Sequence, residues 1–277
     1  MLSEDRRNRI LEMVNAGGAV SVKALSETLG VSEMTIRRDL DRLASLGYLR
    51  RIHGGASPSV STAYEPPFGV REERNLREKR LIGKEAARLV RDGETLIMDV
   101  GTTTLEVARN LNGAHNLTIL TNSLLIAMEM ASRRDFSVYL LGGLLRGQEM
   151  STVGSVTEAI LRSYFADKVI MGTGGISAKS GLSNFDVAEA HVRRVMLESA
   201  REAIVVADGS KFSRRAFVSV APLEKINCVV TDCSAPAEEI EAMREKGIRV
   251  ILCGRADPHG TGGAEAAQRD GRPKGVE

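Results

Sequence analysis

Three polar residues close together near the N-terminus, Thr35, Arg37 and Arg38, are of types that bind nucleic acid. Arginine pairs with guanine or phosphate through two nitrogens, and threonine hydrogen-bonds to base edges. In a helix, at about 100° per residue, Met34 and Arg38 would share the face opposite an apolar stripe. Thr35 and Arg37 would lie on the two flanks of that stripe. The spacing therefore favours a helix that enters the major groove of double-stranded DNA.

The surrounding residues predict two helices joined by a tight turn. Ser21 is suited to begin the first helix, and Gly30 is suited to end it. Ser32 offers the cap of a second helix, which we expect to run to Gly47. The apolar stripe on the buried side of this second helix consists of Ile36, Leu40 and Leu43.

A small β-wing is predicted over residues 48–55, where β-forming residues are followed by a flexible pair of glycines. Such a wing would bring Arg51, His53 and the backbone of Gly54 beside DNA phosphates. Contacts to phosphates add charge-dependent affinity without reading the base sequence.

A third helix over residues 4–16 would complete a winged helix-turn-helix domain. Its arginines, which we expect to be exposed near the DNA backbone, are Arg6, Arg7 and Arg9. Domains of this shape also bind proteins, but here the caps, the turn, the stripe, the basic face and the wing all agree with DNA. The candidate DNA-binding residues are Ser32, Met34, Thr35, Arg37, Arg38, Arg51, His53 and Gly54.

The segments VSEMTIRRDLDRL and LRRIHGGA resemble the N-terminal domain of the DeoR family of bacterial regulators of sugar metabolism. The resemblance spans nearly the whole predicted domain. Its motif is specific, because a Thr-Ile-Arg-Arg-Asp-Leu core is followed by a wing that ends in His-Gly-Gly-Ala. The resemblance implies that the domain binds an operator in double-stranded DNA.

The length and charge of the chain bear on how it would hold DNA. With 277 residues, of which 43% are hydrophobic, the chain can form a small domain and a larger one with its own core. Its net charge is only +2, and residues 1–57 hold nine Lys or Arg against seven Asp or Glu. One copy therefore has little charge for binding DNA, and we expect a homo-oligomer, either a dimer or a tetramer.

Composition excludes several other classes of protein. The three cysteines lie in apolar runs and the four histidines lie far apart, so we expect no disulfide, no metal and no cofactor. No segment approaches the roughly 20 apolar residues of a membrane span. We therefore expect a soluble protein of the cytoplasm with no membrane partner.

The chain after the wing predicts an α/β fold. We expect the winged domain to cover residues 1–57, a linker residues 58–75, the larger domain residues 76–253, and a disordered tail residues 254–277. A helix over residues 70–91 would lead into the larger domain. Beyond it, β-rich runs alternate with amphipathic stretches, which indicates a mostly parallel sheet covered by helices. The expected strands are 95–100, 117–121, 136–141, 168–171, 203–207, 228–231 and 249–252, and the expected helices include 123–132, 155–164, 186–200 and 235–246.

Polar residues follow several of these strands, where ligands bind in open α/β sheets. The segment DVGTTT at 99–104 offers glycine, hydroxyls and a helix N-terminus, which suit a phosphate, although a plain threonine cap would also explain it. Lys211 follows a later strand, where it would meet a phosphate or a sugar hydroxyl. The candidate effector-binding residues are Asp99, Gly101, Thr102, Thr103, Thr104, Asn122, Ser123, Gly142, Gly143, Arg146 and Lys211.

The resemblance to the DeoR family extends over residues 68–253, through DVGTTT, TNS, LGG, GISAKSGL and ADGSKF. It implies a domain that resembles ribose-5-phosphate isomerase and binds a phosphorylated sugar or a related metabolite. By the same resemblance, residues 101–104 would hold the phosphate and Lys211 would contact the ligand. The pocket would be lined by Asn122, Gly142 and Gly143.

Two other functions are weighed against a ligand-released repressor. A sugar-phosphate isomerase needs a carboxylate base, and the segment GTGGIS at 172–177 has none where the isomerase relatives carry acidic residues. A DNA-binding protein without an effector would not need so many polar residues at one edge of the sheet. We expect a repressor that a phosphorylated sugar releases from its operator, although an activator could use the same parts.

Overall fold

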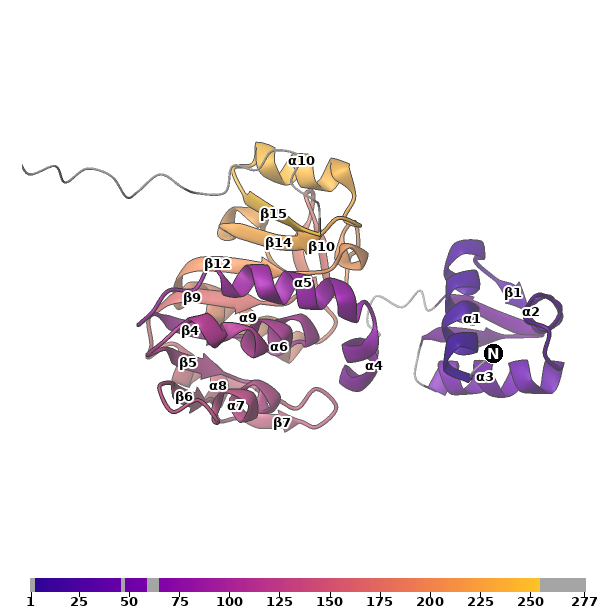
Figure 1. Ribbon diagram of the computed structural model, residues 1–277, viewed down its shortest axis with the longest axis horizontal. Helices are drawn as coiled ribbons and strands as arrows, with labels where there is room; N and C mark the ends of the chain where they lie inside the picture. The colour runs from indigo at the N-terminus through magenta and orange to yellow at the C-terminus, as the bar shows by residue number, and fades with distance from the viewer. Residues whose placement is uncertain (1–2, 46–47, 59–64, 255–277) are drawn as a thin grey trace, which may run out of the picture.

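The chain forms a small N-terminal domain and a larger α/β domain (Figure 1). The computed structural model describes residues 3–45, 48–58 and 65–254. The tail that we expected to be disordered lies outside the described residues except for Gly254, and so do residues 59–64 of the expected linker.

The N-terminal domain packs three helices against a three-stranded antiparallel sheet of order β1-β3-β2. The predicted helix-turn-helix and its wing are both present. The apolar stripe of α3 is buried in the core of this domain, together with Ile10, Val14 and Leu25. The elements are α1 (Ser3–Gly17), β1 (Val20–Ser21), α2 (Val22–Leu29), α3 (Glu33–Ser45), β2 (Leu49–Ile52) and β3 (Gly55–Pro58).

Local capping explains why the helix-turn-helix forms at these residues. The side chain of Ser21 accepts a hydrogen bond from the backbone of Ala24 at 3.1 Å, which satisfies a free N–H at the start of α2. Gly30 ends α2 in the left-handed conformation, with φ of 65°, that glycine adopts without strain. Ser32 accepts from the backbone of Thr35 at 3.3 Å and so caps α3 as predicted.

A seven-stranded parallel sheet forms the centre of the larger domain, in the order β15-β14-β12-β9-β4-β5-β6. These are the seven strands predicted from the sequence: β4 (Thr95–Met98), β5 (Thr118–Thr121), β6 (Ser137–Leu140), β9 (Ala166–Met171), β12 (Ala200–Val206), β14 (Cys228–Asp232) and β15 (Arg249–Cys253). From β4 the chain runs outward through β5 to β6, and from β9 it runs outward in the opposite direction. The sheet therefore changes direction between β4 and β9, and ligands bind beyond the carboxyl ends of strands at such a point.

Helices cover both faces of this sheet, and each face has its own apolar core (Figure 1). Because both faces are buried, the strands are continuous apolar runs, and this made them easy to predict. One face carries α5 (Leu76–Ala87), α6 (Thr102–Arg109) and α7 (Leu124–Met130), and the other carries α8 (Ser155–Leu161), α9 (Val187–Glu198) and α10 (Ala237–Glu245).

Two small antiparallel sheets were not predicted. One is the hairpin of β7 (Leu144–Arg146) and β8 (Ser151–Val153), and the other has the order β10-β11-β13. Their strands are only three or four residues long, which is too short to show a clear alternation of apolar and polar residues. The remaining short elements are β10 (Gly175–Ser177), β11 (Gly181–Asn184), β13 (Val218–Ala221), and the 3-10 turns η1 (Leu111–Gly113), η2 (Gly209–Lys211) and η3 (Leu223–Lys225).

The segment that enters the larger domain differs from the prediction. We expected a linker over residues 58–75 and a helix over 70–91, whereas the structure has two helices, α4 (Phe68–Glu73) and α5. They are separated at Asn75, which has a left-handed backbone with φ of 53°. Phe68 is 5% exposed and packs into the core, so the second half of the expected linker is part of the larger domain.

Candidate DNA-binding surface and ligand site

The recognition helix α3 presents the predicted face to solvent. Met34 is 61% exposed, and Arg37 and Arg38 are exposed as well, whereas Thr35 is half-buried. Arg37 pairs with Glu33 one turn earlier, at 3.2 Å. No salt bridge or hydrogen bond ties Arg38 to the residues that the structure describes, so its guanidinium is available to a base or a phosphate.

The wing carries the exposed His53 and Gly54 at its turn, where Gly54 has φ of 75°. Arg51 lies differently from what the sequence suggested. Its guanidinium donates to the carbonyl of Gly55 at 2.9 Å and pairs with Asp41 of α3 at 3.0 Å. Arg51 therefore braces the wing against the recognition helix, and its contact with DNA phosphate stays a prediction.

Arg6 is a correction to the sequence reading. We expected it to be exposed toward the DNA backbone, but its side chain is 13% exposed and pairs with Asp39 of α3 at 2.6 Å. Asp39 sits on the buried side of α3 among the apolar residues. The pair fixes α1 to the recognition helix, because a buried carboxylate needs a partner.

The candidate ligand site lies where the sheet changes direction. The loops that follow β4, β9 and β12 meet there and surround two small adjoining hollows. Both hollows share Arg71, Thr102 and Lys211. The first is further lined by Pro66, Arg74, Asn75, Lys79, Phe185, Asp208, Ser210 and Arg214, and the second by Glu65, Val100, Gly101, Thr103, Gly172, Thr173, Arg193, Val206 and Ala207.

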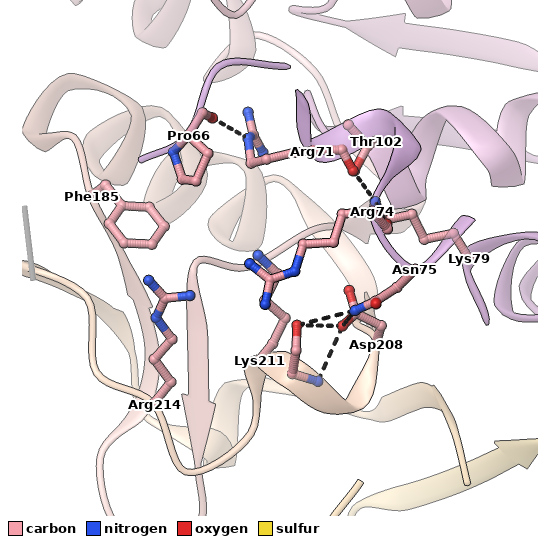
Figure 2. A pocket seen from close by; sticks show the side chains of 11 residues that line it. Pro66, Arg71, Arg74, Asn75, Lys79, Thr102, Phe185, Asp208, Lys211 and Arg214 are labelled. Carbon is pink, nitrogen blue, oxygen red and sulfur yellow. Dashed lines mark hydrogen bonds between the residues drawn. The ribbon is translucent and has the colours of Figure 1, made fainter. Parts of the chain in front are cut away.

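Cationic side chains dominate the first hollow (Figure 2). Arg71 is held by carboxylates, because it pairs with Glu149 and with Glu65 at 3.1 Å. Arg74 and Lys211, in contrast, form no salt bridge with the described residues. The hollow therefore has positive charge to spare for an anion.

Burial lowers the pKa of two lysines at this site to about 8. Lys79 is buried and donates to the backbone carbonyls of Arg71 and Arg74. The positive charges of the two arginine side chains also lower the pKa of Lys79. For Lys211 burial is again the main cause, and Asp208 opposes it. At neutral pH both lysines are still mostly protonated and can attract an anion.

Asp208 organises the loop after β12. It accepts a hydrogen bond from the side chain of Asn75 at 2.8 Å and caps η2 through the backbone of Ser210. Burial favours a raised pKa for Asp208, but Lys211 and the hydrogen bonds from Ser210 and Asn75 outweigh it and lower the pKa. The Asn75 contact ties the break between α4 and α5 to this loop.

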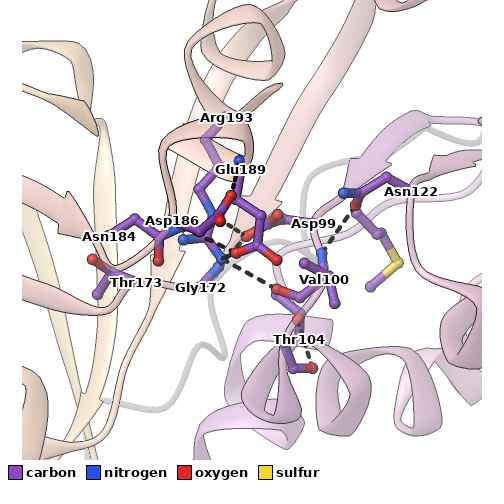
Figure 3. A network of polar contacts seen from close by, with 12 residues as sticks. Asp99, Val100, Thr104, Asn122, Gly172, Thr173, Asn184, Asp186, Glu189 and Arg193 are labelled. Carbon is purple, nitrogen blue, oxygen red and sulfur yellow. Dashed lines mark hydrogen bonds and ion pairs between the residues drawn. The ribbon is translucent and has the colours of Figure 1, made fainter. Parts of the chain in front are cut away.

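A buried ion pair lies beside the second hollow (Figure 3). Asp99, which follows β4, accepts from Arg193 of α9 at 2.9 Å and from the backbone of Gly172 at 3.3 Å. Burial raises the pKa of Asp99 to about 6, and Arg193 opposes the rise. For Arg193, burial favours a lowered pKa, but Asp99 and Glu189 outweigh it and raise the pKa.

Arg193 retains one unused donor. Its Nη1 is buried and has no hydrogen-bond partner among the described residues, although Arg193 lines the second hollow. A buried donor without a hydrogen bond is destabilising, so this nitrogen is a candidate to donate to an oxygen of a bound ligand. This role of Arg193 was not predicted from the sequence. The signal for it was the position of this arginine on the apolar side of α9, one turn after Glu189.

The structure brings only part of the predicted effector set into the hollows. Gly101, Thr102, Thr103 and Lys211 line them, and Asp99 lies behind them as a structural pair. Thr104 is buried and donates to the carbonyl of Gly101 at 2.9 Å, so its hydroxyl serves the start of α6.

The other predicted effector residues line neither hollow and have internal partners. Asn122 accepts from the backbone of Val100 at 3.1 Å and donates to the carbonyl of Thr152 at 3.1 Å. Ser123 caps α7. The carbonyl of Gly142 accepts a hydrogen bond from Thr157, and Gly143 packs closely against the same threonine. Arg146 forms ion pairs with Glu189 and Asp186.

Comparison with known proteins identifies the family. A model described as the DeoR C terminal sensor domain matches residues 74–233, and a model of the DeoR-like helix-turn-helix domain matches residues 6–62. The chain belongs to the DeoR family of transcriptional regulators. The sensor match contains Arg74, Lys211 and the whole DVGTTT loop, so the two hollows lie largely within the DeoR sensor domain.

The DeoR relatives are regulators rather than enzymes, which agrees with the prediction from the missing carboxylate. The chain is 37% identical over 251 residues to the HTH-type transcriptional regulator GlpR of Haloferax volcanii, covering 91% of this chain and 98% of the relative. It is 34% identical to the glycerol-3-phosphate regulon repressor of Escherichia coli, covering 91% of this chain and all of the relative. A solved ribose 5-phosphate isomerase A from Methanocaldococcus jannaschii is similar in fold, with a TM-score of 0.37 and 18% identity over 50% of this chain and 55% of that chain.

Two further properties concern the described residues of this DeoR protein. None of its described helices combines the length and the apolar character needed to cross a membrane. Within the same residues, no group of three or more His, Cys, Asp or Glu could hold a metal ion.

Replacing Arg38 by Ala should cost about 1–3 kcal/mol of operator binding, because this exposed guanidinium has no partner among the described residues and would face the DNA groove. The measurement is an anisotropy titration against duplexes selected from a random pool by the wild-type protein. Arg244→Ala, on the surface of α10, is the control and should bind within about 0.5 kcal/mol of wild type. Equal weakening on selected and scrambled duplexes would show that Arg38 grips phosphate instead of reading a base.

Binding of a phosphate monoester should weaken about tenfold from pH 7 to pH 9, because Lys211 loses its proton near pH 8 while the monoester, with a second pKa of about 6, stays dianionic. Calorimetry with glycerol 3-phosphate and hexose 6-phosphates across this range measures the effect. Lys211→Arg keeps its charge at all these pH values, so its affinity should fall less than that of the wild type, and the remaining fall should come from Lys79, whose pKa is also lowered to about 8. The same loss of affinity in Lys211→Arg would exclude Lys211 as the titrating group.

Proposed function

We propose that this DeoR-family protein is a cytoplasmic repressor of genes for the use of a carbohydrate or polyol, and that a small phosphorylated metabolite releases it from its operator. The observation that carries the proposal is the unpaired, buried Nη1 of Arg193, which lines the second hollow next to the cationic first hollow of the sensor domain. The names of the relatives support it, since one is a glycerol-3-phosphate regulon repressor and another is a putative aga operon transcriptional repressor.

In this proposal the phosphate would bind at the N-terminus of α6. Helix α6 begins at Thr102, and the first N–H groups of a helix have no partner within it, so they attract an anion. A Cβ at Gly101 would lie 2.8 Å from the hydroxyl of Thr104, so a larger residue would require that hydroxyl to move. The hydroxyls of Thr102 and Thr103 and the ammonium of Lys211 would complete the phosphate site.

The rest of the ligand would occupy the space between this loop and the segment over residues 65–75. Ser210 and Thr173 offer hydroxyls there, and Arg74 and Arg214 offer cations. These groups suit a hydroxylated, anionic molecule. The apolar contribution comes mainly from the ring of Phe185, which Arg214 stacks upon at 5.1 Å.

Release from DNA would follow from competition for Arg71. In the structure Arg71 is held by Glu149, by Glu65 and by the carbonyl of Pro66 at 2.8 Å. A phosphate in the hollow would draw the guanidinium away from Glu65, because a dianion is the stronger partner. Residues 65–67 continue the chain from the winged domain, so the change would alter how that domain is held.

Replacing Thr102 and Thr103 together by Val should leave operator binding intact and abolish release by the phosphorylated probe, because the hydroxyls that complete the phosphate site are lost. A thermal-shift screen of glycerol 3-phosphate and hexose phosphates first selects the probe, since selective binding raises stability. Operator release is then measured by anisotropy.

The matched control replaces Thr95 and Thr118 by Val. These residues begin β4 and β5, at the end of the sheet away from the ligand site, so this variant should respond like the wild type. Normal release of the Thr102 and Thr103 variant would refute the phosphate site. If no phosphorylated metabolite stabilised the wild type, the protein would act without such an effector and the proposal would fail.

A further inference from the structure

The positive charge of this chain is concentrated in one short segment of the larger domain. Residues 71–91 hold eight Lys or Arg against four Asp or Glu, which is a net charge of +4. The whole chain holds 38 against 36, so the remaining residues hold 30 Lys or Arg against 32 Asp or Glu and are slightly acidic. The surplus of positive charge therefore begins in α4 and continues through α5.

The exposed cations of α5 and of the residue that caps its end form a stripe. They recur every three or four residues, so at about 100° per residue they share one face of the helix. They are Arg77, Arg80, Lys84 and Arg88, and we call them the α5 stripe. At 1.5 Å per residue the α5 stripe is about 16 Å long. The opposite side of α5 packs over β12, β14 and β15, so the stripe faces away from the sheet (Figure 1).

The α5 stripe is unfavourable for the helix that carries it. Arg77, Arg80 and Lys84 form no ion pair with any residue that the structure describes. Only Arg88 is paired, with Glu85 at 2.5 Å. Like charges three or four residues apart repel each other and destabilise a helix. Arg77 also lies in the first turn, where the partial positive charge of the helix N-terminus disfavours a cation. These costs would be offset if the stripe bound an anionic partner.

The C-terminal segment of the chain does not match the α5 stripe in charge. It begins next to α5, because a Cβ at Gly254 would lie 3.3 Å from the side chain of Leu81. Residues 255–277 hold four Lys or Arg against four Asp or Glu. They have no surplus of negative charge with which to neutralise the stripe.

The winged domain brings a dense polyanion within reach of the α5 stripe. Strand β3 of the wing ends at Pro58, and α4 begins at Phe68. The nine residues between them can span at most about 30 Å, which is close to one turn of DNA. Double-stranded DNA carries one negative charge for about every 1.7 Å of its axis. A stripe about 16 Å long can therefore lie along several phosphates of a duplex that the winged domain holds.

We propose that the α5 stripe binds the phosphate backbone of the operator beside the half-site that the winged domain reads. The winged domain alone, with nine Lys or Arg against seven Asp or Glu, has little net charge for phosphates. The α5 stripe adds positive charge from the sensor domain, with contacts to phosphates and none to bases. The proposal uses DNA binding by the winged domain and does not depend on which metabolite the sensor domain binds.

The test is the salt dependence of operator binding by the full chain after the α5 stripe is neutralised. Binding is measured by anisotropy between about 50 and 300 mM KCl, on selected and scrambled duplexes extended by one helical turn at each end. The Arg77→Gln, Arg80→Gln and Lys84→Gln triple variant should bind both duplexes at least about tenfold more weakly at the lowest salt. The slope of log affinity against log salt should become shallower by about 2–3 for each chain bound, because each lost phosphate contact removes about 0.9.

Two further variants separate a phosphate contact from a general loss of charge or of folding. Exchanging Arg for Lys and Lys for Arg at the same three positions keeps the charge and should keep the wild-type slope. The matched control, Arg134→Gln with Lys179→Gln and Lys225→Gln, removes three exposed cations outside α5 and should change the slope by less than about 0.5. Circular dichroism shows that each variant is folded. A neutralised stripe with the wild-type slope, or a control that loses as much slope as the stripe variant, would overturn the proposal.

Discussion

The ligand site depends on one buried ion pair across the place where the sheet changes direction. Asp99 follows β4 and Arg193 comes from α9, and their contact at 2.9 Å, with the backbone of Gly172 added, joins the exits of β4 and β9. Removing either partner would leave a buried charge unpaired, which is strongly destabilising. The pair also fixes Arg193 so that its Nη1 has no internal acceptor. The interaction that closes the fold at this point thus leaves this donor available to the ligand that we propose.

The segment over residues 65–75 connects this site to the winged domain. It supplies Arg71 and Arg74 to the hollows, and its last residue, Asn75, is tied to Asp208 after β12. A ligand in the hollows therefore contacts the same residues that lead to the DNA-binding domain. Because each site biases the same segment, DNA and ligand would weaken each other to the same extent.

The sequence predicted the elements whose pattern is local and missed those that depend on packing. The seven strands and the helix-turn-helix were recognisable because apolar runs and caps at Ser21 and Ser32 are local signals. The ligand site was only half recognised, because Arg71, Arg74 and Arg193 reach it from helices that sequence spacing does not place there. Arg6 was expected to face the DNA backbone, but Asp39 on α3 holds it within the domain.

The most direct test of the account is the coupling between operator and phosphorylated probe in Asn75→Gly. Glycine keeps the left-handed backbone at this position and removes the side-chain hydrogen bonds to Asp208 and Ser210. The wild type should show the same coupling, of at least about fivefold, in both directions. Asn75→Gly should bind the operator like the wild type and should bring the coupling close to one, even if the probe binds less tightly because Asn75 lines the first hollow. Asn116→Gly, a left-handed asparagine elsewhere with φ of 56°, should couple like the wild type. Undiminished coupling in Asn75→Gly would contradict the role given to residues 65–75.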